Sequence, residues 1–297
     1  MTKQKKVIVI GAGIGGIGTA AILARQGCDV TIFEKNPYPG GRCGSIQMDG
    51  YRFDTGATFL MMPGIYKSIF QLAGREMTEI MRLHRIDPIY KVVFPGGTAI
   101  RFTSDLACLQ EQFEKIETGS YRRFLKLLNK GFHIYENSMQ LIDRNYFRVL
   151  DPSLIRYPFL LLKYKAFNNH YRYISRYFKS DELRALFTFQ NLYLGQNPLA
   201  ASGMYTFLPF MEISDGVYFP EGGMHRVAES LLSLARENGV KVNLGTPVSK
   251  IDVNHRLARG IELEGGAFHG ADMIVSNADV PFVYDKLLPE NRMAKRL

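Results

Sequence analysis

A run of closely spaced glycines near the N-terminus has the residue types and spacing that hold a dinucleotide. Gly11, Gly13 and Gly16 follow directly on the apolar, β-branched run Val7–Ile10. The first glycine permits a tight strand-to-helix turn, the second lets the backbone approach a diphosphate, and the third lets the helix pack close to the sheet. The N–H groups that begin the helix would then face the phosphates.

An acid at the end of the next predicted strand strengthens this interpretation. Glu34 follows the run Val30–Phe33 and lies 23 residues after Gly11, close to the spacing of an acid that binds a ribose hydroxyl. The alternative is a signal peptide or short membrane anchor, because Val7–Ala24 carries no charge. Its five glycines make a poor membrane helix, and that alternative leaves Glu34 unexplained.

A second glycine motif comes soon after the acid. Gly40, Gly41 and Arg42 follow a proline, and Phe53–Gly56 comes next. Paired glycines allow the chain to lie against a flat or phosphorylated ligand, and Arg42 can pair with a diphosphate through its planar fork. The plainer alternative is a Gly-Pro turn followed by a hairpin, with Arg42 in solvent.

These motifs together resemble a known family. Gly11–Gly16, Glu34, Gly40–Arg42 and Phe53–Gly56 are similar to the two-motif signature of the flavin-binding amine oxidase and phytoene desaturase superfamily. Three later blocks resemble the bacterial-type carotenoid desaturases in particular, and the resemblance runs over essentially the whole chain. These blocks are 191–198, 216–224 and 271–279.

The resemblance implies FAD as the cofactor and carries a set of cofactor-binding residues with it. They are Gly11, Ala12, Gly13, Ile14, Gly15, Gly16, Glu34, Lys35, Gly40, Gly41, Arg42, Thr55, Gly56, Ala57, Thr58, Val248 and Asn277. Val248 is expected at the adenine end. No pair of histidines has metal-ligand spacing and there is no CxxC motif, so no metal site is predicted.

The element pattern predicts an α/β protein: a Rossmann-like FAD-binding domain interrupted by an α+β, mostly helical substrate domain. We expect the first part of the FAD domain at 1–72, the substrate domain at 73–215 and the second part of the FAD domain at 216–297. Within the substrate domain, 89–94 and 98–102 are typical of a hairpin. Ser104 is the expected cap of a helix that runs to Ile116, and 121–145 has helical periodicity.

Composition is that of a globular protein, with 46% hydrophobic and 22% charged residues. Three widely spaced cysteines argue against a disulfide framework and favour a reducing, cytoplasmic location. There is no GxSxG motif, which removes the simplest hydrolase interpretation.

The net charge of +9 is concentrated in part between Arg144 and Lys179, where basic residues alternate with tyrosine, phenylalanine and leucine. Such a stretch suits an anionic membrane surface, single-stranded nucleic acid, or a solvated helical face. A hydrophobic polyene substrate favours the membrane over nucleic acid. We therefore expect peripheral attachment to the inner face of the membrane; the oligomeric state stays open.

The chemistry implied by the resemblance is desaturation of a carotenoid precursor such as phytoene or diapophytoene, with hydride transfer to the flavin. Loss of a hydride leaves an allylic cation, so a negative or π-rich group should lie nearby. Glu212, Tyr193 and Tyr205 are the substrate-side candidates. The plainer alternatives are a packed core residue for Tyr193 and a solvated loop acid for Glu212. The sequence does not name the base.

Two other classes of function stay open. The first keeps the flavin but changes the reaction to that of a carotenoid oxygenase, a carotenoid isomerase or an amine oxidase. The second is a lipid- or protein-binding module like the Rab GDP-dissociation inhibitors, although such a module has no need of Glu34 and Arg42. Relatives of this type are longer and carry a further glycine-rich block that closes over the flavin ring. We therefore expect a truncated chain or one half of a split enzyme.

Overall fold

The computed structural model describes residues 4–142, 158, 159, 162 and 167–288. The chain divides into two compact units: Met1–His84 with Tyr218–Leu297, and Arg85–Val217. The first boundary lies later than the predicted residue 72. The reason is that α2 (Pro63–Leu72) and α3 (Met77–Ile80) belong to the first unit, where Met77 and Met81 are buried in the core.

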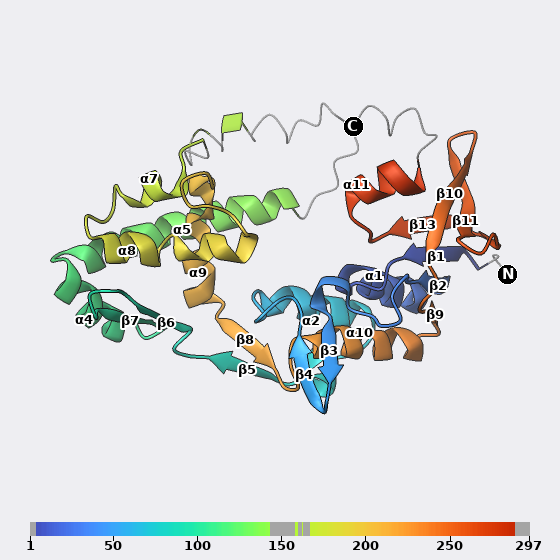
Figure 1. Cartoon of the computed structure of the whole chain (residues 1–297), viewed down its shortest axis with the longest axis horizontal. Helices are drawn as coiled ribbons and strands as arrows, with labels where there is room; N and C mark the ends of the chain where they lie inside the picture. Colours follow the sequence, from blue (N-terminus) through green and yellow to red (C-terminus); the bar gives the residue numbers. More distant parts are fainter. Residues whose placement is uncertain (1–3, 143–157, 160–161, 163–166, 289–297) are drawn as a thin grey trace. The chain divides into compact units, whose positions relative to one another are not determined.

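The first unit is built on a four-stranded parallel sheet with the order β13-β1-β2-β9 (Figure 1). The strands are β1 (Lys6–Ile10), β2 (Asp29–Phe33), β9 (Lys241–Asn243) and β13 (Met273–Ser276). Strands β1 and β2 lie where the sequence predicts them. The Rossmann-like fold is thus confirmed, with the glycine turn at the end of β1.

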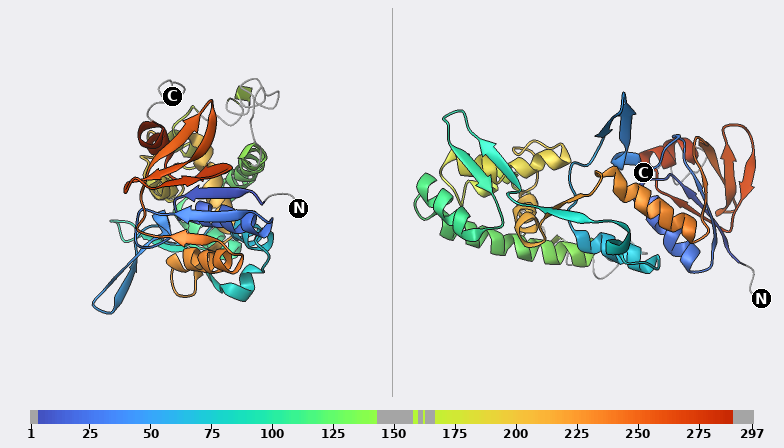
Figure 2. Two further views of the ribbon diagram at one scale, coloured as in Figure 1. Left: turned by 90° about the vertical axis from the view of Figure 1, so that its right-hand side faces the viewer. Right: turned by 90° about the horizontal axis from the view of Figure 1, so that it is seen from below.

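Both faces of this sheet are covered, so β1 is apolar without alternation. Val7 and Val9 pack in the core beneath α1 (Ile14–Arg25) and α10 (His225–Glu237), whereas Ile8 and Ile10 pack in a second core on the other face. The second core is completed by a three-stranded sheet and by the helical turn η5 (Val283–Leu287). Figure 2 shows this layering around the strands. The three-stranded sheet consists of β10 (Val248–Asn254), β11 (Leu257–Leu263) and β12 (Phe268–Gly270).

Helix α10 begins only after a glycine pair. Gly222 and Gly223 have φ angles of +89° and +95°, so they form a turn that precedes the helix. The helix ends before Gly239, which has a φ of +88°, as is usual for the glycine that follows a helix.

A two-stranded ribbon follows the second glycine motif. It pairs β3 (Ser45–Met48) with β4 (Tyr51–Asp54) in antiparallel register. Its four large apolar side chains share one face, because Ile46 lies opposite Phe53 and Met48 lies opposite Tyr51. All four are exposed.

The second unit begins with the predicted hairpin, now β6 (Tyr90–Val93) and β7 (Ala99–Phe102). Helix α4 (Leu106–Ile116) follows, but its cap is Asp105 rather than the predicted Ser104. The Asp105 carboxylate accepts the N–H groups of Ala107 and Cys108, which satisfies two free donors of the first turn. The Ser104 hydroxyl instead donates to Asp87, at 3.0 Å.

The core of the second unit is an aromatic cluster. Five fully buried phenylalanines contact one another in stacked and edge-to-face pairs: Phe102, Phe113, Phe124, Phe178 and Phe187. Around them lie α5 (Ser120–Ile142), α7 (His170–Ile174), α8 (Asp181–Leu186), η3 (Phe189–Leu194), η4 (Gly203–Thr206) and α9 (Phe207–Ser214). The chain passes between the units in β5 (Leu83–Ile86) and β8 (Val217–Pro220), which pair with each other.

The predicted basic and aromatic stretch lies largely outside the described residues, which resume at residue 167 after three isolated positions. Within the described part of the chain, no helix combines the length and apolar character needed to cross a membrane.

Candidate functional site

The first unit contains a cavity of about 750 Å³ at the carboxyl ends of β1 and β2. This edge of a parallel sheet is where α/β folds bind their ligands. The predicted cofactor residues that line the cavity are Gly11, Gly13, Ile14, Glu34, Lys35, Gly40, Gly41, Arg42, Ala57, Val248 and Asn277. Residues of the first glycine motif, of the second glycine motif and of the segment 277–282 thus line one pocket.

The other predicted residues do not line the cavity themselves. Ala12 is fully buried, and its N–H group donates to Glu34. Gly16 is required by packing, because a Cβ atom there would collide with the carbonyl oxygen of Gly11. Gly56 is held in the same way against the carbonyl of Arg42. Gly15, Thr55 and Thr58 are likewise absent from the lining.

Asn277, which is predicted as a cofactor residue, also lies directly against the glycine turn. A Cβ atom on Gly13 would approach the amide nitrogen of Asn277 to 2.5 Å, and one on Gly15 would approach its amide oxygen to 2.6 Å. Asn277 follows β13, which lies beside β1 in the sheet. These two glycines therefore make room for an amide side chain as well as for a ligand.

Glu34 is held rigidly at the pocket wall. Its side chain is buried, with one oxygen accepting the N–H of Ala12 at 2.7 Å and the other that of Asn36 at 2.9 Å. A carboxylate has about four acceptor sites, so capacity remains for a ribose hydroxyl. Glu34 therefore both holds the glycine turn in place and lines the cavity.

Arg42 is placed by a left-handed turn. Gly40 and Gly41 have φ angles of +110° and +56°, and the N–H of Gly40 donates to Ala12 at 2.7 Å. The Arg42 guanidinium lies against the carboxylate of Asp279, with an Nη2 to Oδ1 distance of 2.8 Å. The second glycine motif is thereby fastened beside the first.

Cys43 also lines the pocket. Its thiol donates to the carbonyl of Met224 at 3.0 Å. Burial, with a smaller contribution from Asp54, raises the pKa of the Cys43 thiol to about 11. The thiol stays protonated at neutral pH and acts as an apolar wall rather than as a nucleophile.

A second polar cluster lies in the second unit and brings together two of the three substrate-side candidates. The fully buried Glu212 on α9 accepts a hydrogen bond from the Tyr193 hydroxyl at 2.7 Å. Its other oxygen accepts from the Tyr90 hydroxyl at 3.2 Å and from the Gln190 amide at 3.1 Å. The plain alternative of a solvated acid is therefore wrong for Glu212.

Burial raises the pKa of the Glu212 carboxyl to about 7, although the three hydrogen bonds lower it in part. The carboxyl group can therefore hold or release a proton near neutral pH. Burial and the neighbouring Glu212 also raise the pKa values of Tyr193 and Tyr90, so both hydroxyls stay protonated as donors.

Tyr205, the third candidate, is not part of this cluster; its hydroxyl accepts from Gln196 at 3.5 Å. Sequence reasoning missed Tyr90 and Gln190. Their contacts with Glu212 span 122 and 22 residues, and no local motif marks them.

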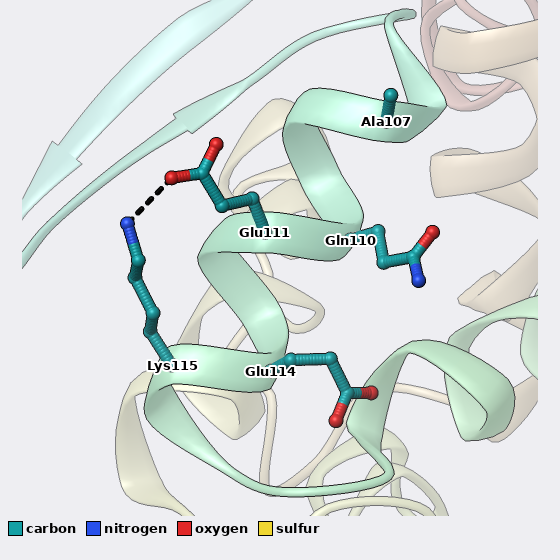
Figure 3. A pocket seen from close by; sticks show the side chains of 5 residues that line it. All are labelled: Ala107, Gln110, Glu111, Glu114 and Lys115. Atoms are coloured by element: carbon teal, nitrogen blue, oxygen red, sulfur yellow. Dashed lines mark hydrogen bonds and ion pairs between the residues drawn. The ribbon is translucent and has the colours of Figure 1, made fainter.

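Another cavity of about 450 Å³ runs along α4 and is lined by Ala107, Gln110, Glu111, Glu114 and Lys115 (Figure 3). Its charges are already satisfied. Lys115 pairs with Glu111 at 2.6 Å, and Glu114 accepts the N–H groups of Gly119 and Tyr121. We assign no ligand to it. Among the described residues, no group of His, Cys, Asp and Glu side chains is arranged to hold a metal ion.

Comparison with known proteins decides the family. The flavin containing amine oxidoreductase family matches residues 14–295. The chain belongs to this family. Family membership makes FAD the dinucleotide of the pocket described above.

Curated relatives extend over almost all of this chain. A zeta-carotene-forming phytoene desaturase of Myxococcus xanthus is 40% identical over 297 residues, which are 99% of this chain and 57% of the relative. A 4,4'-diapophytoene desaturase of Staphylococcus aureus is 34% identical over 291 residues, which are 96% of this chain and 57% of the relative. The chain spans about half the length of the curated relatives it matches.

Solved structures agree on the fold. A putrescine oxidase with bound putrescine superimposes with a TM-score of 0.65 at 18% identity, covering 96% of this chain and 60% of the other. At this identity, the likeness supports the amine oxidoreductase fold and nothing further.

The residues of the pocket fit FAD. No side chain caps the N-terminus of α1 at Gly13, which leaves this positive helix end for the diphosphate. Glu34 lines the cavity with acceptor capacity to spare, and the cavity volume is within the range of cofactor sites. As a member of the amine oxidoreductase family, the chain would hold FAD through Gly11, Gly13, Glu34 and Arg42.

Proposed function

We propose that this chain carries the FAD-binding and substrate-side parts of an oxidoreductase that desaturates a carotenoid precursor such as phytoene or diapophytoene. The observation that supports this most is a pocket lined by both glycine motifs and Glu34, in a chain that is 40% identical to a phytoene desaturase. The two curated relatives named above, at 40% and 34% identity, are both desaturases, whereas the putrescine oxidase is 18% identical.

In this proposal a C–C single bond becomes a double bond. When bound, FAD supplies the acceptor for the hydride, so both electrons of one C–H bond leave with it. The neighbouring carbon then loses a proton, which requires a basic or negative group near the developing cation.

Glu212 is our candidate for the group that takes or holds this proton. Its carboxyl is fully buried and its nearest donor is the Tyr193 hydroxyl at 2.7 Å, while the Tyr193 ring is only partly buried. Tyr193 is therefore more accessible than Glu212. A proton would reach the Glu212 carboxylate through the Tyr193 hydroxyl. Tyr205 would contribute an aromatic wall.

Peripheral attachment to the cytoplasmic face of the membrane is the second part of the proposal. Leu192, Leu194 and Leu199 are 63%, 47% and 62% exposed. Backbone hydrogen bonds hold 168–171 beside 198–203, and the exposed Arg172 and Lys179 follow in the chain. Exposed leucines and exposed cations within one stretch of the chain suit the interface of an anionic membrane, which is also the source of a water-insoluble polyene.

Expression in a phytoene-accumulating host tests the reaction. The proposal expects new pigments with longer conjugation in pigment extracts, and fewer of them with Glu212→Gln. An unchanged phytoene profile, from cells in which the purified chain carries FAD, would contradict it.

Vesicle sedimentation tests the attachment. The chain should sediment with anionic vesicles more than with neutral ones, and replacement of all three exposed leucines by serine should reduce this. Equal sedimentation of both proteins would contradict the membrane assignment.

A further inference from the structure

The ion pair between Arg42 and Asp279 lies at the wall of the FAD pocket, and both residues line that pocket. A single guanidinium nitrogen of Arg42 contacts both carboxylate oxygens, at 2.8 and 3.0 Å. The side chains are 88% and 69% exposed, so water and solutes reach both partners. Exposed pairs of this kind are weak and exchange readily.

Asp279 also has another place for its carboxylate. It is the N-cap residue of α11 (Val280–Phe282), a position where aspartate usually accepts a backbone N–H from the first turn of the helix. Here no side-chain capping bond forms. Pro281 has no N–H, so the Phe282 N–H is the partner within reach of a cap. The Asp279 carboxylate can therefore either pair with Arg42 or cap α11, and in this structure it pairs with Arg42.

The side chains that line the pocket include one more carboxylate than cations. Three carboxylates (Glu34, Glu264 and Asp279) face two cations (Lys35 and Arg42). Glu34 already serves the backbone and the ribose position. Asp279 is the carboxylate that directly occupies the guanidinium which an incoming dianion needs.

We propose that Asp279 is an internal competitor of the FAD diphosphate for Arg42. The diphosphate displaces the Asp279 carboxylate, Arg42 turns to the phosphates, and Asp279 moves to the cap of α11. This lowers the affinity for FAD below what the same pocket would reach without the acid. The inference rests on the FAD binding assigned above but not on the proposed reaction.

Titration of the flavin-free chain with FAD, and separately with ADP, tests this by calorimetry. Asp279→Asn keeps a good N-cap residue while removing the charge, so the fold should persist. We expect its dissociation constants for both ligands to fall about fivefold, the upper range for an exposed ion pair. Arg42→Gln should weaken both, and Asp279→Asn should have no effect in the Arg42→Gln background.

Asp49→Asn is the matched control. It removes the same charge from the same unit at an exposed turn position with a φ of +52°, which asparagine accepts. It should leave both constants unchanged.

The proposal is overturned if Asp279→Asn leaves the affinity unchanged or weakens it, which would make Asp279 a support for Arg42. It is also overturned if the tightening persists in the Arg42→Gln background or is equalled by Asp49→Asn. Binding of ADP without FAD would instead contradict the cofactor assignment, while the ADP series would still decide the competition. Absence of binding of either ligand would overturn both.

Discussion

Glu212 should make the stability of this protein depend on pH in a direction opposite to that of most carboxylates. Burial raises its pKa from the ordinary 4.5 to about 7 in the folded chain. Between these values the folded protein binds a proton that the unfolded chain has released, so the free energy of unfolding falls as the pH rises. At one pKa unit per roughly 1.4 kcal/mol, the full difference corresponds to about 3 kcal/mol.

Glu212→Gln removes the titrating group and keeps its shape. The side-chain oxygen of Gln190 is buried without a hydrogen-bond partner, so rotation of the Gln190 amide would let it accept from the new amide. The variant should therefore fold and lose the pH dependence that Glu212 contributes.

Urea unfolding followed by circular dichroism at pH 5 and pH 8 measures the effect. We expect the wild-type chain to lose about 2 to 3 kcal/mol more than the Glu212→Gln variant over this interval. Glu111→Gln is the control: Lys115 lowers the pKa of this exposed acid, so any change it makes should be small and of opposite sign. Identical pH profiles for the wild type and Glu212→Gln would refute the reasoning.

Two further predictions concern the dinucleotide pocket. Gly16→Ala should abolish FAD binding, because the added Cβ would collide with the backbone carbonyl of Gly11. Gly18→Ala should be tolerated better, since the nearest atom to its Cβ is a side-chain methyl of Ile69 at 3.1 Å, which needs to shift by only a few tenths of an ångström. Equal flavin content in the two purified variants would contradict the packing argument. Glu34→Ala should weaken FAD binding at least tenfold and lower the melting temperature, because the N–H groups of Ala12 and Asn36 both lose their acceptor. Fluorescence titration measures the binding, and thermal unfolding measures the melting temperature. An unchanged melting temperature would show that Glu34 does not support the turn.

The sequence predicts the dinucleotide pocket well because its determinants are local. The turn at Gly11, the helix after it and the acid at Glu34 follow one another within a single β-α-β unit, where each residue type has one geometric role. Apolar runs and the glycines that flank them are sufficient to predict the bounds of β1 and β2.

The rest depends on contacts that no local pattern records. Asp279 meets Arg42 across 237 residues, and Tyr90 meets Glu212 across 122. The Asn277 side chain occupies the space where Cβ atoms of Gly13 and Gly15 would lie, and it reaches this place only because β13 pairs with β1. The predicted cap of α4, Ser104, is one residue too early, because Ser104 and Asp105 are both good caps. The bond of Ser104 to Asp87, which decides between them, spans 17 residues.

Anaerobic reduction of the bound flavin by the polyene tests the central claim most directly. Phytoene in anionic vesicles is mixed with the FAD-loaded chain, and the visible spectrum is followed in the absence of oxygen. Our account predicts that the absorbance of oxidised flavin declines while the absorbance of a longer conjugated polyene appears in step with it. A chain that holds FAD, meets phytoene and keeps its flavin fully oxidised would contradict the assignment.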